Sequence, residues 1–407
     1  MTELPYAELE DRLDPGNRRV VGQQQARLQL SRILTSGRLS HAYLFAGPVG
    51  SGKKALALSF AEAINGIENL SDLHGKAFSK KSGWAAHPDI HFFLPLPSGA
   101  SFSELQNRTK LLAADPYDVV DFSLRPTIDS DTSGANKNAF YSVDYFRDEI
   151  RPKAYLRPNE GYRNVIILTN IETMRAEVAN AFLKILEEPP PNLMFLLTTD
   201  NPNALLPTII SRCQLIRCNP LTVQEIENQL QEKDGVSASD AAYLARASGG
   251  NYSLTKFYDV DHLKSHRNQV VEFMRYAYTR DALNIVDMAA RWHADLNREG
   301  QVSILNMLEL FIRDLAIYRD TRSEDLITNR DQTEVIRKFC DSLGDADLDK
   351  MQGEIESFRR ILRQNVSPKL AFTVLANRYS EYMRGRNAAI ADDNPWKHMP
   401  ATTRITS

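Results

Sequence analysis

The feature that most constrains this fold is a glycine-rich segment, Gly47-Pro-Val-Gly-Ser-Gly-Lys53, which directly follows the short apolar run His41–Ala46. The Gly-x-x-x-x-Gly-Lys spacing lets consecutive backbone N–H groups wrap a phosphate, and the following helix N-terminus and the lysine add positive charge. Apolar residues then recur at helical spacing until Asn65-Gly66 supplies a stop. The segment therefore predicts a strand, a phosphate-loop and a helix, with these candidate binding residues: Gly47, Gly50, Gly52 and Lys53.

Two positions that handle magnesium in a working phosphate-loop are altered. The full motif ends in Ser or Thr, whose hydroxyl ligates the metal, but position 54 is Lys54. A later buried strand should end in an acidic pair, but Val165–Leu168 runs into Thr169 and Asn170, which carry no carboxylate. We therefore expect no metal ligands here and no intrinsic ATPase activity. Three interpretations stay open: a loop kept for folding alone, binding of ATP or ADP without turnover, and hydrolysis.

Four further runs are apolar almost throughout, as strands buried on both faces of a parallel sheet are. They are Ile90–Leu94, Val165–Thr169, Leu193–Thr199 and Gln214–Arg217. Between two of them, Glu177–Glu188 has one apolar face and ends at three consecutive prolines. Strands separated by crossovers predict an α/β three-layer P-loop domain with a parallel sheet over residues 1–220. Residues of about 95–138 are rich in Ser, Asp, Pro and Gly and form a long insertion, to which we assign no structure or role.

The strand signals stop beyond the last of these runs. Two segments, Thr222–Glu225 and Ser237–Asp240, begin with a hydroxyl and have a carboxylate three residues later, which is typical of helix N-termini. A small helical domain is predicted over residues 221–260. An all-α domain is predicted over residues 265–384, where few Gly or Pro interrupt the helical periodicity. The tail, residues 385–407, has no sustained periodicity and is expected to be flexible.

Composition narrows the class of protein and its compartment. The 407 residues are too many for one ordinary domain. Lys plus Arg total 49 and Asp plus Glu 52, so the net charge of −3 gives no general attraction to nucleic acid, and any such contact must be local or shared with partners. Three cysteines without a CxxC pair exclude a disulfide framework and a cysteine-rich zinc site. The chain shows no apolar leader and no run of about 18 apolar residues, so we expect a cytoplasmic protein that does not span a membrane.

Several motifs together resemble the clamp-loader branch of the AAA+ ATPases. Leu183-Lys-Ile-Leu-Glu-Glu-Pro-Pro190 followed by Ser211-Arg-Cys213 matches two highly specific markers of that branch. Three shorter matches fall in the same order along the chain: Val20–Gln23, His41–Phe45 and Gly249–Asn251. The resemblance covers residues 18–260 well and the later helices only in general character. It implies that the two helical regions are a lid domain and a collar domain for oligomerisation.

Within that family, motor subunits keep the Ser/Thr and the acidic pair, whereas stator-like delta-prime subunits commonly lack a working site. Thr169-Asn170 and His87–Phe92 resemble the delta-prime kind. The resemblance implies a hetero-oligomer with the ATPase (tau/gamma) and delta subunits of the DNA polymerase III clamp loader. Its further partners would be the sliding clamp and, through the complex, primer-template DNA during replication. Many relatives carry a four-cysteine zinc module after the first helix, but residues 66–90 contain no cysteine, so no zinc is expected.

The same resemblance assigns a role to Arg212. In the family, the arginine of the Ser-Arg-Cys motif reaches the ATP bound by the adjacent subunit. A guanidinium suits this role because it stays charged and offers paired donors to the transferred phosphoryl group. The bland alternative is a surface arginine paired with a carboxylate or lying over a strand end. The chain is thus predicted to be a non-hydrolysing, stator-type subunit that donates an arginine finger in trans.

Two enzymatic alternatives stay open. In the first, the chain is an active motor ATPase in which Lys53 and Lys54 bind phosphate and another carboxylate holds the metal; Asp200, near a strand end, is the best-placed candidate. In the second, it is a small-molecule P-loop kinase, which leaves the Ser-Arg-Cys and Leu-Glu-Glu-Pro-Pro motifs unexplained. Turnover of nucleotide by the isolated chain separates both alternatives from the stator prediction.

Overall fold

The computed structural model divides the chain into two compact units, Met1–Tyr258 and Asp259–Ser407. The structure describes residues 20–65, 84–100, 102–122, 125, 139–256, 260–296, 298–324, 326–329, 332–363 and 366–385. The predicted tail from Arg386 onward and most of residues 123–138 lie outside the described residues.

The first unit is built on a parallel sheet of five strands in the order β2-β5-β6-β1-β7. The strands are β1 (Ala42–Ala46), β2 (Ile90–Phe93), β5 (Asn164–Leu168), β6 (Leu193–Thr199) and β7 (Gln214–Arg217). Each coincides with a predicted apolar run to within one or two residues. A separate antiparallel pair joins β3 (Leu96–Pro97) and β4 (Ala139–Phe140).

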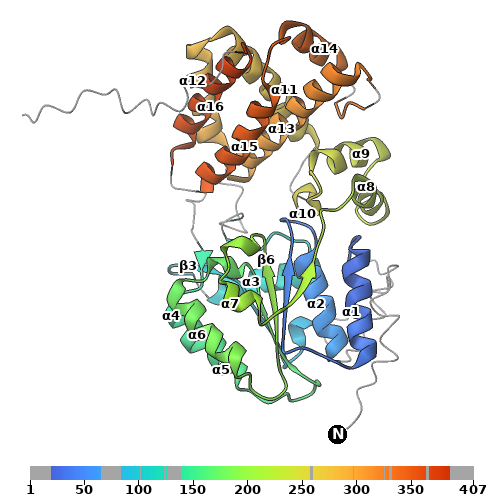
Figure 1. The fold of residues 1–407 in the computed structure, drawn as a ribbon, viewed down its shortest axis with the longest axis vertical. Helices are drawn as coiled ribbons and strands as arrows, with labels where there is room; N and C mark the ends of the chain where they lie inside the picture. The colour runs from blue at the N-terminus through green and yellow to red at the C-terminus, as the bar shows by residue number, and fades with distance from the viewer. Residues whose placement is uncertain are drawn as a thin grey trace, which may run out of the picture. The chain divides into compact units, whose positions relative to one another are not determined.

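Both faces of this sheet are covered, which explains why its strands are apolar without alternation. On β1, Tyr43 packs its ring against Phe60 of α2, whereas its neighbour Leu44 belongs to the core cluster that contains Phe182 of α6. The helices α1 (Gln24–Ser36) and α2 (Lys53–Ile64) lie on one side of the sheet in Figure 1, and α6 (Ala176–Glu187) lies on the other. The short segments α4 (Val143–Tyr145), η4 (Phe146–Ile150) and α5 (Arg151–Ala154) lie on the α6 side. The predicted α/β three-layer fold is therefore confirmed.

The insertion contains more structure than its sequence indicated. A 13-residue helix, α3 (Phe102–Ala114), lies in the part of the insertion that the structure describes. The turn η3 (Trp84–Ala86) precedes the insertion and leads into β2. The buried Arg108 of α3 donates to the carbonyls of Val120 and Arg125 at 2.9 and 2.7 Å, and its guanidinium lies 3.6 Å from the centre of the Phe122 ring. One buried cation thus fixes the chain that follows α3.

Three helices complete the first unit: α8 (Val223–Glu232), α9 (Ala238–Ala247) and α10 (Tyr252–Thr255). The capping box predicted at Thr222 and Glu225 is present in both directions. Ser237 caps α9 by accepting from the backbone of Asp240, as expected. The remaining short helices of this unit are η5 (Ile171–Thr173), η6 (Pro202–Ala204) and α7 (Pro207–Ile210). The proposed domain boundaries at 220, 260 and 265 stay a prediction.

The second unit consists, in its described part, of helices α11 (Val260–Thr279), α12 (Ala282–Asp295), α13 (Arg298–Thr321), α14 (Thr333–Ser342), α15 (Leu348–Arg363) and α16 (Pro368–Tyr382). Aromatic packing marks its core, since the ring of Trp292 lies 5.1 Å from that of Phe273 and 4.8 Å from that of Phe372. Among the helices that the structure describes, none is long and apolar enough to cross a membrane.

Candidate functional site: a phosphate-loop filled by its own chain

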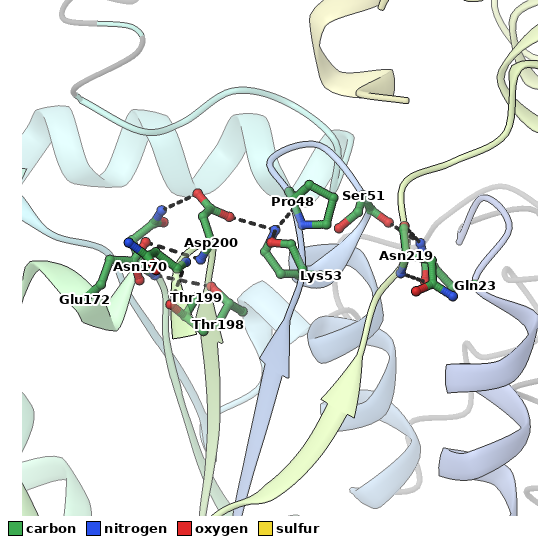
Figure 2. A network of polar contacts seen from close by, with 12 residues as sticks. Gln23, Pro48, Ser51, Lys53, Asn170, Glu172, Thr198, Thr199, Asp200 and Asn219 are labelled. Atoms are coloured by element: carbon green, nitrogen blue, oxygen red, sulfur yellow. Dashed lines mark hydrogen bonds and ion pairs between the residues drawn. The ribbon is translucent and has the colours of Figure 1, made fainter. Parts of the chain in front are cut away.

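The predicted phosphate-loop lies where ligands bind in open α/β sheets, beyond the carboxyl ends of the strands. It connects β1 to α2, and its amide at Gly47 donates to Thr199 O at the end of β6 at 3.3 Å. Gln23 ties the loop to the chain after β7, because its side-chain amide donates to Ser51 O at 2.8 Å and to Asn219 O at 2.6 Å (Figure 2). The structure therefore brings the four predicted loop residues together at the expected edge of the sheet.

The ammonium of Lys53 is fully engaged within the protein. It donates to Gly47 O at 2.8 Å and to Pro48 O, and it forms an ion pair with Asp200 Oδ1 at 2.7 Å (Figure 2). An ammonium has three N–H donors, so these three acceptors satisfy it completely. The side chain is 6% exposed. A phosphate would have to displace one of these acceptors to reach it.

Asp200, the candidate substitute metal ligand, is the anion paired with Lys53 in this structure. Its second oxygen accepts from Asn170 Nδ2 at 3.2 Å, and its backbone N–H donates to Glu172 Oε1 at 3.3 Å (Figure 2). Burial and the nearby Asp200 charge raise the pKa of Glu172 above its usual value. Asn170 has a left-handed backbone with φ of 50°, in the place where a working site would present an acidic residue.

Lys54 takes up the position of the missing metal-binding hydroxyl and points into an acidic environment. Its Nζ donates to Asp118 O at 3.3 Å. Burial lowers its pKa, and the neighbouring charges of Asp121, Asp200 and Asp118 oppose that shift. Because an ammonium cannot ligate a cation, this lysine excludes a magnesium ion rather than binding one.

The glycines of the loop are approached closely by side chains and backbone of the same unit. A methyl group built on Gly50 would lie 1.5 Å from Asn251 Oδ1, and one on Gly52 would lie 2.6 Å from the Tyr117 hydroxyl. Gly50 and Gly52 also have positive φ values of 72° and 92°. For Gly47, the corresponding clash is with the backbone carbonyl of Cys218 at 2.1 Å. Internal packing alone therefore accounts for all three glycines.

The residues over the loop are themselves held in place. Tyr117 is 1% exposed and its hydroxyl accepts from Val21 N at 2.8 Å. Its ring packs edge-to-face on Tyr252 of α10, with 5.0 Å between ring centres. One ion pair, between Asp115 and Lys256, joins the chain after α3 to the chain after α10. A magnesium–nucleotide does not fit these residues, since the lysine is satisfied, the metal ligands are missing and the glycines are covered.

No alternative metal centre is formed by the described residues. Within them, no group of three or more His, Cys, Asp or Glu side chains is placed to hold a metal ion. Burial raises the pKa of the Cys213 and Cys218 thiols to about 12, which disfavours the thiolate that zinc requires.

Arg212 makes its contacts away from the loop, just after α7. Its Nη2 forms an ion pair with Glu187 Oε1 at 2.7 Å, and its Nη1 donates to Thr208 O at 2.9 Å. Arg212 is 34% exposed and Glu187 49%. The surface arginine paired with a carboxylate, foreseen as the bland alternative, is thus observed, while the guanidinium stays accessible to solvent.

Sequence reasoning missed three contributors to the site. Tyr117 lies in the insertion that had no assigned structure, Glu172 lies just beyond the altered acidic pair, and Asn251 was noted only as part of a motif. A signal existed only for Asn251, which lies in the Gly249–Asn251 motif, because asparagine is a preferred N-cap residue. Nothing in the sequence indicated that this cap would lie on Gly50.

Two models of protein families match this chain. The profile of the family described as "DNA polymerase III, delta subunit" matches residues 22–222, and that of "DNA polymerase III, delta subunit, C terminal" matches residues 261–381. The chain is 26% identical to DNA polymerase III subunit delta' of Bacillus subtilis over 300 residues, which cover 73% of this chain and 78% of the relative.

Other relatives match a smaller part of the chain. DNA polymerase III subunit gamma/tau of Mycobacterium bovis is 31% identical over 237 residues, which are 57% of this chain but only 34% of that relative. Among solved structures, a DNA polymerase III gamma subunit-related protein from Thermotoga maritima aligns with a TM-score of 0.38 and 18% identity, covering 88% of this chain and 100% of that one.

Proposed function

Because this chain belongs to the DNA polymerase III delta-subunit family, we propose that it is a stator-type subunit that does not hydrolyse ATP and lends Arg212 to the ATP of a neighbouring subunit. The chain is a clamp-loader subunit of DNA polymerase III, homologous to delta' and to tau/gamma. The proposal adds that it assembles with tau/gamma and delta subunits and, through them, helps to place a sliding clamp on primed DNA.

The observation that carries the proposal is the saturated ammonium of Lys53. In a working site this lysine binds the β- and γ-phosphates, but here it is bound to Gly47 O, Pro48 O and Asp200 Oδ1. The absence of a hydroxyl at Lys54 and of a carboxylate at Asn170 removes the two groups that would hold magnesium. A site without metal ligands and with a neutralised lysine has no means to stabilise the charge of a transferred phosphoryl group.

The contribution to a neighbour is supported by the chemistry and accessibility of Arg212. Its guanidinium lies at the end of the one-turn helix α7 and is partly exposed, so it can meet a further anion. An arginine finger supplied in trans raises turnover by roughly 10³ to 10⁵ through stabilisation of the transition-state charge. The chain would thus supply an outward-facing cation while Lys53 stays paired with Asp200.

Reconstitution of the clamp loader with Arg212→Ala tests this directly. We expect the variant to fold and to assemble, because an exposed ion pair contributes only about 0–1 kcal/mol. Turnover at the neighbouring ATP site should fall by ~10³-fold or more. Arg212→Lys is the matched control for charge, and it should also be impaired because an ammonium lacks the planar fork. Unchanged ATP hydrolysis by a fully assembled Arg212→Ala complex would refute the finger.

The active motor ATPase remains the competing proposal because one carboxylate, that of Asp200, does lie beside Lys53. It predicts magnesium-dependent ATP hydrolysis by the isolated chain that is lost in Lys53→Ala. The stator proposal predicts no hydrolysis by either protein, so this measurement separates the two without any partner subunit.

A further inference from the structure

Two motifs that are separate in the sequence meet at one ion pair. Glu187 is the last residue of α6 and the first glutamate of the Leu-Glu-Glu-Pro-Pro segment, and Arg212 is the arginine of the Ser-Arg-Cys segment. Their side chains are joined at 2.7 Å, and the opposite end of the guanidinium is bound at 2.9 Å to the carbonyl of Thr208. Both terminal nitrogens of Arg212 therefore have a bonding partner within the protein.

Glu187 lies at the C-terminal end of α6, where a negative charge is unfavourable for the helix. The C-terminal end of a helix carries partial negative charge, so a carboxylate there is unfavourable and a cation is favourable. The last turn of α6 already contains Lys184 as its basic residue. An ion pair as exposed as this one also adds little to stability. Neither helix formation nor stability of the fold accounts for the carboxylate at this position.

We propose that Glu187 is a positioning residue that holds Arg212 ready for the triphosphate of a neighbouring subunit. The inference rests on the proposed function, since it assigns to Glu187 an effect that passes through the arginine finger. Arginine has several rotatable bonds, and fixing it only when the anion arrives would oppose catalysis. The contacts with Glu187 and Thr208 engage two of the five N–H donors of Arg212 in advance.

The contact with Glu187 has opposite effects on ATP binding and on turnover. The carboxylate of Glu187 restricts the guanidinium, which favours the step in which phosphoryl charge develops. The same negative charge repels an approaching triphosphate, which disfavours binding. Removing the charge should therefore lower kcat without raising KM for ATP. A residue needed only for folding would not separate the two constants in this way.

The test compares Glu187→Gln with Glu188→Gln in the reconstituted clamp loader. Glu188 is the adjacent exposed residue at the same helix end, so its replacement changes the local charge equally and spares the pair. We expect kcat to fall ~2- to 10-fold in Glu187→Gln, the range that corresponds to fixing one flexible side chain. KM should be unchanged or lower, and Glu188→Gln should behave as the wild type. Glu187→Asp, which keeps the charge, should recover part of kcat.

A double variant separates this inference from the proposed function. If Glu187 acts through Arg212, adding Glu187→Gln to Arg212→Ala should cause no further loss. Normal kcat in Glu187→Gln, equal loss in Glu188→Gln, or an undiminished effect in the Arg212→Ala background would each overturn the positioning role. If Arg212→Ala is impaired while Glu187→Gln is normal, only this inference fails. If Arg212→Ala is itself normal, the arginine finger fails and the inference falls with it.

Discussion

Replacing Gly50 by alanine should reveal whether the loop glycines serve a phosphate or the protein's own packing. A glycine kept for a phosphate alone would leave space for a methyl group in this structure. Instead, a methyl group on Gly50 would lie 1.5 Å from Asn251 Oδ1 and 2.9 Å from Asn251 Cα. The side-chain amide can rotate away but the Cα cannot, so the start of α10 has to shift.

The magnitude follows from three contributions. A left-handed backbone costs about 1–2 kcal/mol for a residue with a Cβ, and Gly50 has φ of 72°. Overpacking adds about 1–3 kcal/mol. Displacing Asn251 also removes the cap of α10, in which its Oδ1 accepts from Leu254 N at 3.3 Å, at a cost of about 1 kcal/mol. We expect a total loss of about 3–6 kcal/mol.

Gly235 supplies the matched control, because it has φ of 66° and nothing within 4 Å of a built Cβ. Gly235→Ala should therefore lose only the backbone contribution, about 1–2 kcal/mol. Hydrogen exchange of the α10 amides in the full chain measures the difference, which should exceed ~30-fold in protection. Equal protection of the α10 amides in the two variants would refute the view that the contact with Asn251 requires a glycine at position 50. In an Asn251→Ala background, the effect of Gly50→Ala should shrink.

Two further changes give predictions of a different kind. Asp89→Asn should destabilise the first unit by about 2 kcal/mol, because the carboxylate accepts from the three consecutive backbone N–H groups of Asn159–Gly161 at 2.6 to 2.8 Å; urea unfolding measures this. Burial raises the pKa of Asp89, but these donors outweigh burial and hold it below 3.8, so the stabilisation is present above pH 3.8 and lost as pH falls further. Unfolding at pH 5 and pH 3 should thus differ more in the wild type than in Asp89→Asn, and an equal difference would contradict this assignment. The double variant Lys54→Thr/Asn170→Glu restores the two positions that handle the metal. Its Kd for ATP, measured by calorimetry, should still be ~1 mM or weaker, because Lys53 stays paired with Asp200. A micromolar Kd would contradict that explanation.

The strands and the loop could be predicted from the sequence because their signals are local. Continuous apolar runs such as Leu193–Thr199 identify buried parallel strands, and the glycine spacing identifies the turn between β1 and α2. The capping signals at Thr222 and Ser237 were likewise sufficient to place the starts of α8 and α9. Each of these features depends on residues within one element, which is why pattern alone reveals it.

The covering of the loop could not be predicted, because it depends on pairs distant in sequence. Tyr117 contacts Gly52 and Val21 but lies just after α3, in a segment with weak hydrophobic periodicity. Because α3 has no strong apolar stripe, the sequence did not predict this helix. The partners of Lys53 are equally remote, as Asp200 lies at the end of another strand. Sequence spacing indicated that the site lacked metal ligands, but only the fold shows which groups took their place.

The lysines of the altered loop and the exposed Arg212 differ in how far their positive charges are already paired within the protein. In a working phosphate-loop the lysine ammonium faces the nucleotide, whose phosphates supply its negative partner, and the metal ion is shared between protein oxygens and the phosphates. Here Asp200 is the negative partner of Lys53, and Lys54 lies among carboxylates in place of a metal. Arg212 has one carboxylate partner but remains accessible, so among these three cations it is the one whose donors a further phosphate can reach. This distribution of charge supports the proposal that the chain acts on ATP held by another subunit, through Arg212.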